Sequence, residues 1–457
     1  MSGSIERLRD FVKDNALIQA VIKNRGKRQL FLVGGIVRDI FLDITPVDYD
    51  FSVSGSGITF ARSLARKLKG AFVLLSEKDD EARVVKDSII FDFVGLGKGN
   101  IQDDLMRRDF TINAMAIDCN TLELLDPHKG QDDLEKGLIS PTSFDSLHKD
   151  PLRILRGFRF ALELDLKLTK EFHRQSQNLD ISKIAAERIG YEIMRITAAP
   201  RSFKMILEMN SLGLFRQIFP EALKIMEDDQ LWTHSLGTYE ALENLVQRGF
   251  FTGIEPEFSN YFNNYRKISL VKLSGLFHDI AKPDTIMVRK GEIHFYGHDT
   301  KGARIVQVLG NKRLKISRPE VGVLHKLVKE HMRLHLLATS KELTDRAIRR
   351  FFRDLSDDWF GAMMIAWADG YATAGWTRHL EEVFVRMVEL KRADDAKPTA
   401  EKLVNGHDLI AMGLEPGPPF KVILQEIYDQ QLEGKITTKE EGMILARQLA
   451  EKYGDGA

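Results

Sequence analysis

A pair of glycines near the N-terminus constrains this chain more than any other feature. Gly34 and Gly35 follow a strand-like run, residues 30–33, and precede a helix-like segment that carries Arg38 and Asp39. Glycines at the junction of a strand and a helix let backbone N–H groups approach a phosphate at the helix N-terminus. The segment therefore predicts a strand–turn–helix unit that binds a phosphate group.

Two aspartates lie one residue apart on the next strand-like run, residues 48–53. Alternate side chains of a strand share a face, so Asp48 and Asp50 point the same way. Carboxylates this close repel each other unless a cation lies between them, and Mg²⁺ binds through one or two carboxylates plus substrate phosphates. We therefore expect a nucleoside triphosphate on the glycine turn, with Asp48 and Asp50 as catalytic metal ligands. Asp92, on a later strand, is a candidate third carboxylate.

Bulk composition narrows the function classes. A chain of 457 residues predicts two to four domains, and 43% hydrophobic with 29% charged residues is typical of a globular protein. The net charge is zero, so an RNA partner would need local basic faces. The single cysteine, Cys119, excludes a disulfide framework and fits a cytoplasmic location. No apolar run approaches about 18 residues, so no membrane contact is expected.

The hydrophobic pattern changes along the chain. Helical periodicity marks residues 5–26 and 59–68 in the N-terminal third. Strand-like runs occupy residues 30–33, 48–53, 71–75, 82–86, 89–94 and 114–118. Residues 150–390 are almost wholly helical in pattern. We therefore predict an α+β fold class, with an α/β head that contains one sheet followed by an all-α remainder.

Five motifs follow one another in a fixed order. They span residues 34–50, 105–116, 126–139, 150–161 and 186–192. In this order they resemble the class II tRNA nucleotidyltransferase and bacterial poly(A) polymerase superfamily. The resemblance implies a polymerase-beta-like head in which an RNA 3′-hydroxyl attacks the α-phosphorus of a nucleoside triphosphate and pyrophosphate leaves. It also implies two Mg²⁺ ions in the head, and a tRNA 3′ end as the partner.

The second and fourth motifs supply the other expected nucleotide contacts. By resemblance the second motif contacts the sugar and the triphosphate, through Arg107, Arg108, Asp109 and Asn113 on or before a strand. Arginine suits this task because its planar fork of donors matches phosphate oxygens.

The fourth motif is the expected base-selecting helix. Asp150 and Arg153 are spaced to share a helix face, where acceptors and donors can read a Watson–Crick edge. Arg156 and Arg159 continue that face toward the triphosphate or the neck. In the family such an Asp-Arg pair selects C and A without a nucleic-acid template. The family usually has Glu before this Asp, where this chain has Lys149, so details of base selection are open.

The identity of the added nucleotide stays open at the sequence level. Full CCA-adding members carry an extended loop between the first two motifs, whereas here the connection, residues 95–105, is short. It resembles the connection of members that add only CC from CTP and leave the terminal A to a separate A-adding enzyme. We favour CC addition. Full CCA addition with CTP and ATP, and A addition or poly(A) synthesis, are the alternatives.

A second constellation lies in the helical part. Its residues resemble the HD domain of metal-dependent phosphohydrolases, in which histidines and aspartates converge on a metal ion. The expected core ligands are His234, His278, Asp279 and Asp369, and His298 and His331 are candidates for a second metal or a phosphate. Imidazole with carboxylate suits a divalent transition metal, and sometimes Mg²⁺. Lys282 is placed to neutralise a phosphate, and His294, His325 and His335 are expected to lie outside the set.

Family members with such a domain hydrolyse 2′,3′-cyclic phosphates or 2′-phosphates. Two other hypotheses therefore stand beside nucleotide addition: that phosphohydrolysis is the main activity, and that the chain is an RNA-binding protein without catalytic turnover. The expected domains are a head at 1–140, a neck at 141–220, the HD-type domain at 221–390 and a helical tail at 391–457. The charged stretch 391–399 is the expected linker before the tail.

Overall fold

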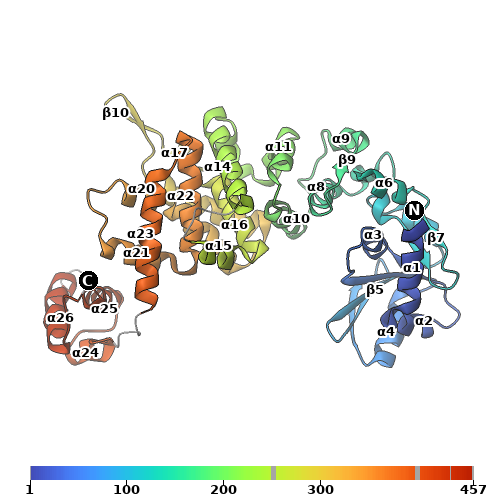
Figure 1. The fold of residues 1–457 in the computed structure, drawn as a ribbon, viewed down its shortest axis with the longest axis horizontal. Helices are drawn as coiled ribbons and strands as arrows, with labels where there is room; N and C mark the ends of the chain where they lie inside the picture. Colours follow the sequence, from blue (N-terminus) through green and yellow to red (C-terminus); the bar gives the residue numbers. More distant parts are fainter. Residues whose placement is uncertain (1, 249–253, 397–401, 433, 455–457) are drawn as a thin grey trace. The chain divides into compact units, whose positions relative to one another are not determined.

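The computed structural model describes residues 2–248, 254–396, 402–432 and 434–454 (Figure 1). The chain forms two compact units. The first contains Met1–Glu227, Tyr265–Lys272 and Gln307–Val321, and the second contains Asp228–Asn264, Leu273–Val306 and Gly322–Ala457. The four domains expected from sequence are a finer division and stay a prediction. Of the expected linker, Lys391 to Asp395 end a helix, and residues 397–399 lie outside the described residues.

The head is built on one seven-stranded sheet with the strand order β3-β4-β5-β2-β1-β6-β7. Strands β2 and β5 are parallel, and the other neighbours are antiparallel. The strands are β1 Leu30–Val33, β2 Asp48–Val53, β3 Ala71–Ser76, β4 Glu81–Lys86, β5 Ile89–Gly95, β6 Ala116–Asp118 and β7 Leu124–Leu125. All six expected strand runs contain a strand, and the α+β class is confirmed.

Helices cover the sheet and continue beyond it in the first unit. Phe60 of α4 packs edge-on against Phe93 of β5, with ring centroids 5.1 Å apart, in the buried core of the head. The helices are α1 Ser2–Asp14, α2 Ala16–Lys23, α3 Gly35–Phe41, α4 Gly57–Leu68, α5 Ile101–Met106, the 3₁₀ turn η1 Thr111–Asn113, α6 Gly130–Lys136, α7 Ser146–Lys149, α8 Arg153–Glu163, α9 Lys170–Ser176, α10 Ala186–Ala198, α11 Phe203–Ser211, α12 Leu214–Ile218, the 3₁₀ turn η2 Pro220–Ala222, α13 Leu223–Met226 and the π-turn η3 Leu309–Leu314. Two short strands, β8 Leu138–Ile139 and β9 Lys167–Leu168, pair in parallel.

The expected helix over residues 5–26 is two helices. The side chain of Asn15 accepts hydrogen bonds from the backbone N–H groups of Leu17 and Ile18 at 3.0 and 3.1 Å. Asparagine in this position caps a new helix N-terminus, so α2 begins where a single helix was expected to continue. The apolar spacing alone did not show this break.

The described residues of the second unit are helical apart from one hairpin (Figure 1). Its helices are α14 Asp229–Arg248, α15 Glu255–Phe262, α16 Tyr265–Phe277, α17 Lys282–Thr285, α18 His298–Val308, α19 Arg318–Glu330, α20 Arg333–Ala338, α21 Asp345–Leu355, the 3₁₀ turn η4 Ser356–Asp358, α22 Trp359–Ala374, α23 Arg378–Asp395, α24 Gly406–Ala411, α25 Pro418–Leu432 and α26 Lys439–Gly454. Helix α16 begins in the first unit. No helix among the described residues combines the length and apolarity that a membrane crossing requires.

The hairpin departs from the all-helical expectation for residues 150–390. It consists of β10 Met287–Arg289 and β11 Glu292–His294. Lys290 and Gly291 form the turn, with φ values of 53° and 82°. Two positive φ angles match the two-residue turns that close hairpins, and glycine adopts this conformation without strain. The Lys-Gly pair was the local signal for it.

A buried ion pair joins two helices of the first unit. Arg159 of α8 donates to Glu192 of α10 at 2.6 Å, and the two residues are 6% and 2% exposed. Arg159 also binds Glu163 on its own helix at 2.8 Å. Since Glu192 lies away from water, its charge depends on this arginine.

We predict that Arg159→Met lowers the free energy of unfolding of the first unit by about 3–5 kcal/mol, because Glu192 keeps a buried carboxylate without its partner. Urea unfolding followed by far-ultraviolet circular dichroism measures the effect. Arg174→Met is the matched control, since it removes an exposed pair with Glu171 and should cost below about 1 kcal/mol. Equal losses in the two variants would contradict the prediction.

Candidate active site and metal cluster

The glycine turn brings Arg108 close to Asp50, one of the two aspartates expected to bind the metal. Gly34 precedes α3 with a φ of 76°. A Cβ atom on it would lie 2.5 Å from Nη1 of Arg108 and 3.7 Å from Oδ2 of Asp50. The positive φ favours glycine here, and a Cβ atom would also displace the Arg108 guanidinium from the turn. The expected turn from strand to helix is present.

Charged residues form a row across three neighbouring strands of the sheet. Asp50 on β2 is in register with Asp92 on β5, and Asp92 is in register with Arg83 on β4. Arg83 donates two hydrogen bonds to Asp92, at 2.7 and 2.8 Å. Asp48 lies exposed at the start of β2, on the same face as Asp50.

The electrostatics of this row fit a divalent cation. Burial raises the pKa of Asp50 to about 6, the Arg108 charge acts against this shift, and the charges of Asp92 and Asp48 add to it. A carboxylate destabilised by burial and by like charges gains from a bound cation. Carboxylate oxygens are also the donors that Mg²⁺ prefers. The residues present therefore fit the magnesium site expected here.

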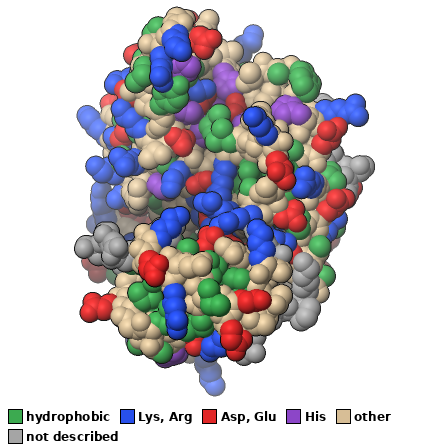
Figure 2. Space-filling model, turned by 90° about the vertical axis from the view of Figure 1, so that its left-hand side faces the viewer, with side chains coloured by type: hydrophobic (Ala, Val, Ile, Leu, Met, Phe, Trp, Pro, Cys, Tyr) green, Lys and Arg blue, Asp and Glu red, His purple; other side chains and the backbone are tan. Residues whose placement is uncertain are grey.

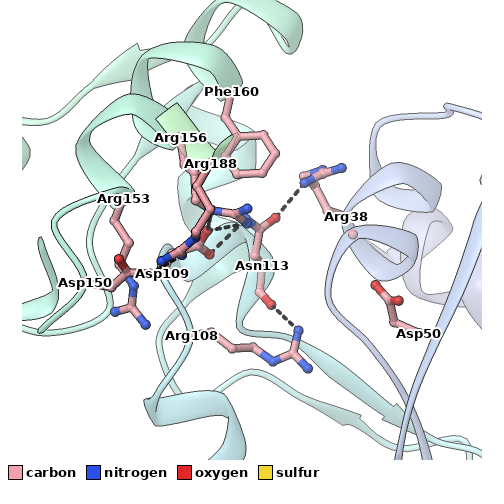
Figure 3. Close-up of a pocket in the computed structure, with 11 residues that line it drawn as sticks. Arg38, Asp50, Arg108, Asp109, Asn113, Asp150, Arg153, Arg156, Phe160 and Arg188 are labelled. Carbon is pink, nitrogen blue, oxygen red and sulfur yellow. Dashed lines mark hydrogen bonds and ion pairs between the residues drawn. The ribbon is translucent and has the colours of Figure 1, made fainter. Parts of the chain in front are cut away.

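An open pocket of about 410 Å³ adjoins Asp50. Its size falls in the range of nucleotide-sized ligand sites. It is lined by Gly35, Arg38, Asp50, Arg108, Asp109, Asn113, Asp150, Arg153, Arg156, Phe160 and Arg188. In Figure 3, Asp50 and Arg38 lie to the right of Asn113, Arg108 lies below it, and Asp150 with the arginines that follow it lies to the left. The pocket thus places a basic lining beside a candidate metal site.

A chain of hydrogen bonds joins four residues that line this pocket. Nη1 of Arg38 donates to Oδ1 of Asn113 at 2.6 Å, Asn113 donates to Asp109 at 3.1 Å, and Arg156 donates to Asp109 at 2.8 Å (Figure 3). Burial alone would raise the pKa of Asp109, but the Arg156 charge and the hydrogen bonds outweigh it and hold that pKa below its usual value. The buried Asp109 therefore holds an arginine of α8 against the head.

Asn113 differs from its expected setting. It lies in the 3₁₀ turn η1, whereas the sequence pattern placed it at the start of, or directly before, the strand-like run 114–118. The N–H group of Asn113 bonds to the carbonyl of Phe110, which closes the turn. Strand β6 begins only at Ala116.

The expected base-selecting pair is present, but its geometry differs from the prediction. Asp150 lies before α8, and its side chain accepts from the N–H of Leu152 at 3.2 Å, while Arg153 is the first residue of the helix. The two side chains do not pair. Asp150 binds Arg188 at 2.9 Å, and Arg153 donates to Ser146 Oγ at 2.7 Å. Both still line the pocket.

Arg188 was missed by the sequence reasoning. It lies in the fifth motif, residues 186–192, for which no nucleotide contact was predicted. The motif held the signal, but a helix distant in sequence gives no indication that its arginine reaches Asp150.

Three expected nucleotide contacts lie elsewhere. Arg107 is exposed and does not line the pocket, although its carbonyl accepts a hydrogen bond from Arg153. Arg159 is buried in its ion pairs with Glu192 and Glu163. Asp39 binds Arg38 at 2.6 Å and orients it.

In the second unit, six expected metal ligands converge. Nε2 of His234 lies 3.2 Å from Nε2 of His278, and Nε2 of His298 lies 3.2 Å from Nε2 of His331. Asp279 lies between these pairs: its Oδ2 is 3.1 Å from His278, and its Oδ1 is 3.5 Å from His298. The sixth residue, Asp369, lies 3.0 Å from His234.

The second ring nitrogen of three of these histidines is held by the backbone. Nδ1 bonds to the carbonyl three residues earlier in His278, His298 and His331, at 2.8, 2.6 and 2.6 Å. A carbonyl can only accept, so each Nδ1 carries a proton and Nε2 is the ring nitrogen directed toward the cluster. Such a bond orients metal-binding histidines.

The carboxylates of the cluster also fit a metal ion. Neither buried oxygen of Asp279 has a hydrogen-bond partner of normal geometry among the described residues, although Nζ of Lys282 lies 2.5 Å from Oδ2. Burial acts to lower the pKa of His278, but Asp279 and Asp369 outweigh it and raise that pKa to about 10. Burial and the His278 charge lower the pKa of His331 to about 4. The two carboxylates thus stabilise a positive charge on His278, and a metal cation bound at the same place would be stabilised in the same way.

His335 is a further residue that the sequence reasoning set aside. Its Nε2 lies 3.1 Å from Oδ2 of Asp369. The other oxygen, Oδ1, faces His234 and His278 at 3.0 and 3.6 Å. His335 therefore orients this carboxylate within the cluster. Its spacing of four residues from His331 was the available signal.

The first unit has the architecture of a nucleotidyltransferase head, in which a carboxylate row meets an arginine-lined nucleotide pocket, and the second has that of an HD-type metal domain. Three family descriptions match the chain: "Poly A polymerase head domain" over residues 30–140, "Probable RNA and SrmB- binding site of polymerase A" over 163–226, and "HD domain" over 231–372. The chain is 31% identical to the A-adding tRNA nucleotidyltransferase of Deinococcus radiodurans, over 92% of this chain and 95% of that protein. It therefore belongs to the tRNA nucleotidyltransferase family of enzymes.

Two further comparisons agree with this assignment. The chain is 29% identical to the CC-adding tRNA nucleotidyltransferase of Thermus thermophilus, over 91% of this chain and 92% of that protein. The structure is similar in fold to the Thermotoga maritima CCA-adding enzyme complexed with tRNA, with a TM-score of 0.67, 21% identity, and 97% of this chain and 98% of that chain covered.

Proposed function

We propose that this enzyme adds the two C residues of the CCA end to tRNA, with CTP as donor and pyrophosphate as the second product. The observation that carries the choice of CC is the short connection between β5 and α5, residues 96–100. An extended loop in this region is the element by which the family changes selection from C to A. The CC-adding relative supports this choice, and the A-adding relative keeps A addition as the alternative.

The residues of the head divide the work of the proposed reaction. Arg38 and Arg108 face the pocket beside the glycine turn, where their donors suit the triphosphate oxygens. Asp50 and Asp48 would hold Mg²⁺, which when bound activates the attacking oxygen and stabilises the leaving group. Arg156, fixed by Asp109, keeps the neck helix in place against the head. The attacking oxygen of the RNA forms the new bond to the α-phosphorus as the bond to pyrophosphate breaks.

Asp150 and Arg153 are the proposed base contacts. Both side chains line the pocket, and their present partners are Arg188 for Asp150, and Ser146 and a backbone carbonyl for Arg153. Cytosine presents an amino donor and two acceptors on its pairing edge, so an acceptor from Asp150 and donors from Arg153 complement it. Rotation of these two side chains toward the nucleotide accompanies binding in this proposal.

The deciding experiment is extension of a radiolabelled tRNA that lacks its CCA end, with Mg²⁺ and either CTP, ATP or both, read at single-nucleotide resolution. We expect two additions with CTP and no further addition when ATP is included. Three additions with both nucleotides would assign full CCA synthesis. Addition of A to a tRNA that already ends in CC would assign the A-adding activity. Either result would overturn the CC proposal.

We predict that Arg153→Ala reduces kcat/KM for CTP by about 10- to 200-fold, because one charged hydrogen-bond donor to the base is lost. Steady-state incorporation with CTP and UTP measures the loss of discrimination. Arg107→Ala is the matched control, since its exposed side chain lies outside the pocket and its carbonyl is retained. Equal activity of Arg153→Ala and wild type would refute the base-reading role.

The metal cluster supports a second activity, hydrolysis of 2′,3′-cyclic phosphates or 2′-phosphates at RNA ends. The observation that favours it is the orientation of three histidines with Nε2 toward Asp279. Two cluster positions are implied: one among His234, His278 and Asp369, and one between His298 and His331. In this reaction water adds to the phosphorus and one P–O ester bond breaks, so that a cyclic phosphate opens to a monoester. Lys282 neutralises charge at the cluster.

A further inference from the structure

The β10–β11 hairpin leaves the metal cluster and returns to it. Lys282 precedes the hairpin and contacts Asp279, and His298 follows the hairpin and contacts Asp279 and His331. Nζ of Lys282 also lies 5.4 Å from the centre of the Phe295 ring. The base of the hairpin therefore forms part of the rim of the cluster, and its strands extend from that rim.

The hairpin exposes an unusual amount of apolar surface. Single exposed apolar side chains are ordinary, but a contiguous group marks a binding surface. The exposed side chains are Ile286 (57%), Met287 (52%), Val288 (69%), Ile293 (59%) and Tyr296 (59%). In Figure 2 hydrophobic side chains lie among basic, acidic and histidine side chains at the top of the face shown, and Figure 1 places β10 at the top.

Two rings on the hairpin form a stacking platform. His294 ends β11 and Tyr296 lies two residues later, in the turn before α18; their rings are stacked with centroids 5.1 Å apart and an interplanar angle of 15°. Tyr296 is 59% exposed and can accept a further flat ring. The tip carries Arg289 and Lys290 against one acid, Glu292, which lies in register with Arg289, so a net positive charge remains that complements a phosphate backbone.

The platform lies within one nucleotide of the cluster. Tyr296 is two residues before His298, so their Cα atoms are at most about 7 Å apart. Nδ1 of His298 bonds to the carbonyl of Phe295 at 2.6 Å, which fixes this short connection. A nucleotide can therefore place its base on Tyr296 and its terminal phosphate at the cluster.

We propose that the hairpin is the base-binding element of the metal cluster. The 3′-terminal base of an RNA stacks on Tyr296, and the phosphate of the same nucleotide lies among the cluster ligands. An RNA end fits this surface better than an apolar partner does, because the ring platform, the basic tip and a phosphohydrolase-like cluster adjoin one another. The inference rests on the proposed phosphohydrolase activity and names its substrate class: a terminal nucleotide with its base.

The test compares two RNA oligonucleotides that end in a 2′,3′-cyclic phosphate, one with a terminal cytidine and one with a terminal abasic ribose. The enzyme is loaded with Mn²⁺. Base–aromatic stacking predicts a KM that is about 5- to 150-fold lower for the cytidine end. Tyr296→Ala should remove most of this difference, while kcat for the abasic end stays unchanged. Tyr296→Phe should keep the difference, and so should Trp376→Ala, which removes a ring of equal exposure, 60%, elsewhere in the unit.

A second readout needs no turnover. 2-Aminopurine riboside 3′-phosphate should lose fluorescence on binding to the wild type and less so with Tyr296→Ala. This quenching without any hydrolysis would support the platform and refute the phosphohydrolase activity. Hydrolysis with an unchanged base preference in Tyr296→Ala would overturn the platform and leave the activity standing. A dimer in sedimentation velocity that Tyr296→Ala dissociates would assign the surface to a second copy of the chain and overturn the inference.

Discussion

Asp50→Asn is expected to reduce nucleotide addition by at least about 10³-fold, because it removes the half-buried carboxylate at the centre of the charged row. Asparagine keeps the size of the side chain and the packing of β2. The lost charge was compensated only by a cation or by nearby arginines, so the fold should tolerate the change. Single-turnover extension of tRNA with CTP measures the effect, and circular dichroism verifies folding.

Asp92→Asn is the informative comparison for this variant. Arg83 already neutralises Asp92 through two hydrogen bonds, so we expect a loss well below that of Asp50→Asn. An exposed carboxylate of the head, Asp43, gives the neutral control. If Asp50→Asn retained a tenth of wild-type activity, the proposed metal position on β2 would be wrong.

The local geometry of the head was predictable because it depends on local rules. Two aspartates separated by one residue must share a face of a strand, and Gly34 must take a conformation that a side chain would obstruct. Neither conclusion needs knowledge of distant contacts. The partner of Asp92 could not be predicted without distant contacts. Arg83 lies beside Asp92 only because β4 pairs with β5 in one particular register. A one-residue shift would separate them.

The fourth motif shows where periodicity alone misleads. Spacing placed Asp150 and Arg153 on one helix face, but the helix starts at Arg153. The side chain of Asp150 instead accepts a hydrogen bond from the backbone N–H of Leu152, so Asp150 lies just before the helix and not on its face. Arg159 shares the helical spacing of Arg156 yet is buried against Glu192, since α10 covers that side. Whether an arginine of α8 is buried depends on the packing of α10 against it, and the residue spacing within α8 does not predict that packing.

The sequence predicted that six histidines and aspartates of the cluster converge, but it missed His335 beside Asp369. The orientation of the rings was not predictable, because the bonds from Nδ1 to carbonyls three residues earlier depend on the exact backbone path. The hairpin was missed for a related reason. Its strands are only three residues long, and short apolar runs such as residues 286–288 do not distinguish strand from helix by pattern.

Asp279→Asn is expected to remove both metal ions from the cluster and to reduce phosphohydrolysis by at least about 10³-fold. Asp279 is the residue that faces both halves, with Oδ2 toward His278 and Oδ1 toward His298. An amide has one oxygen and no charge, so it cannot serve two cations. Metal analysis of the purified protein should give two ions per chain for the wild type and none for the variant. Nucleotide addition should be unchanged, since the head holds its own site.

His331→Gln separates the two positions of the cluster. His331 lies 3.8 Å from Oδ1 of Asp279 and pairs with His298, so its loss should remove one ion and leave the one held by His234, His278 and Asp369. Asp345→Asn, an exposed carboxylate of the same unit, should keep both ions. Loss of both ions in His331→Gln would mean that the positions fill only together. Full metal content in Asp279→Asn would exclude Asp279 as the bridge, because its two oxygens are the only carboxylate atoms that face both histidine pairs among the described residues.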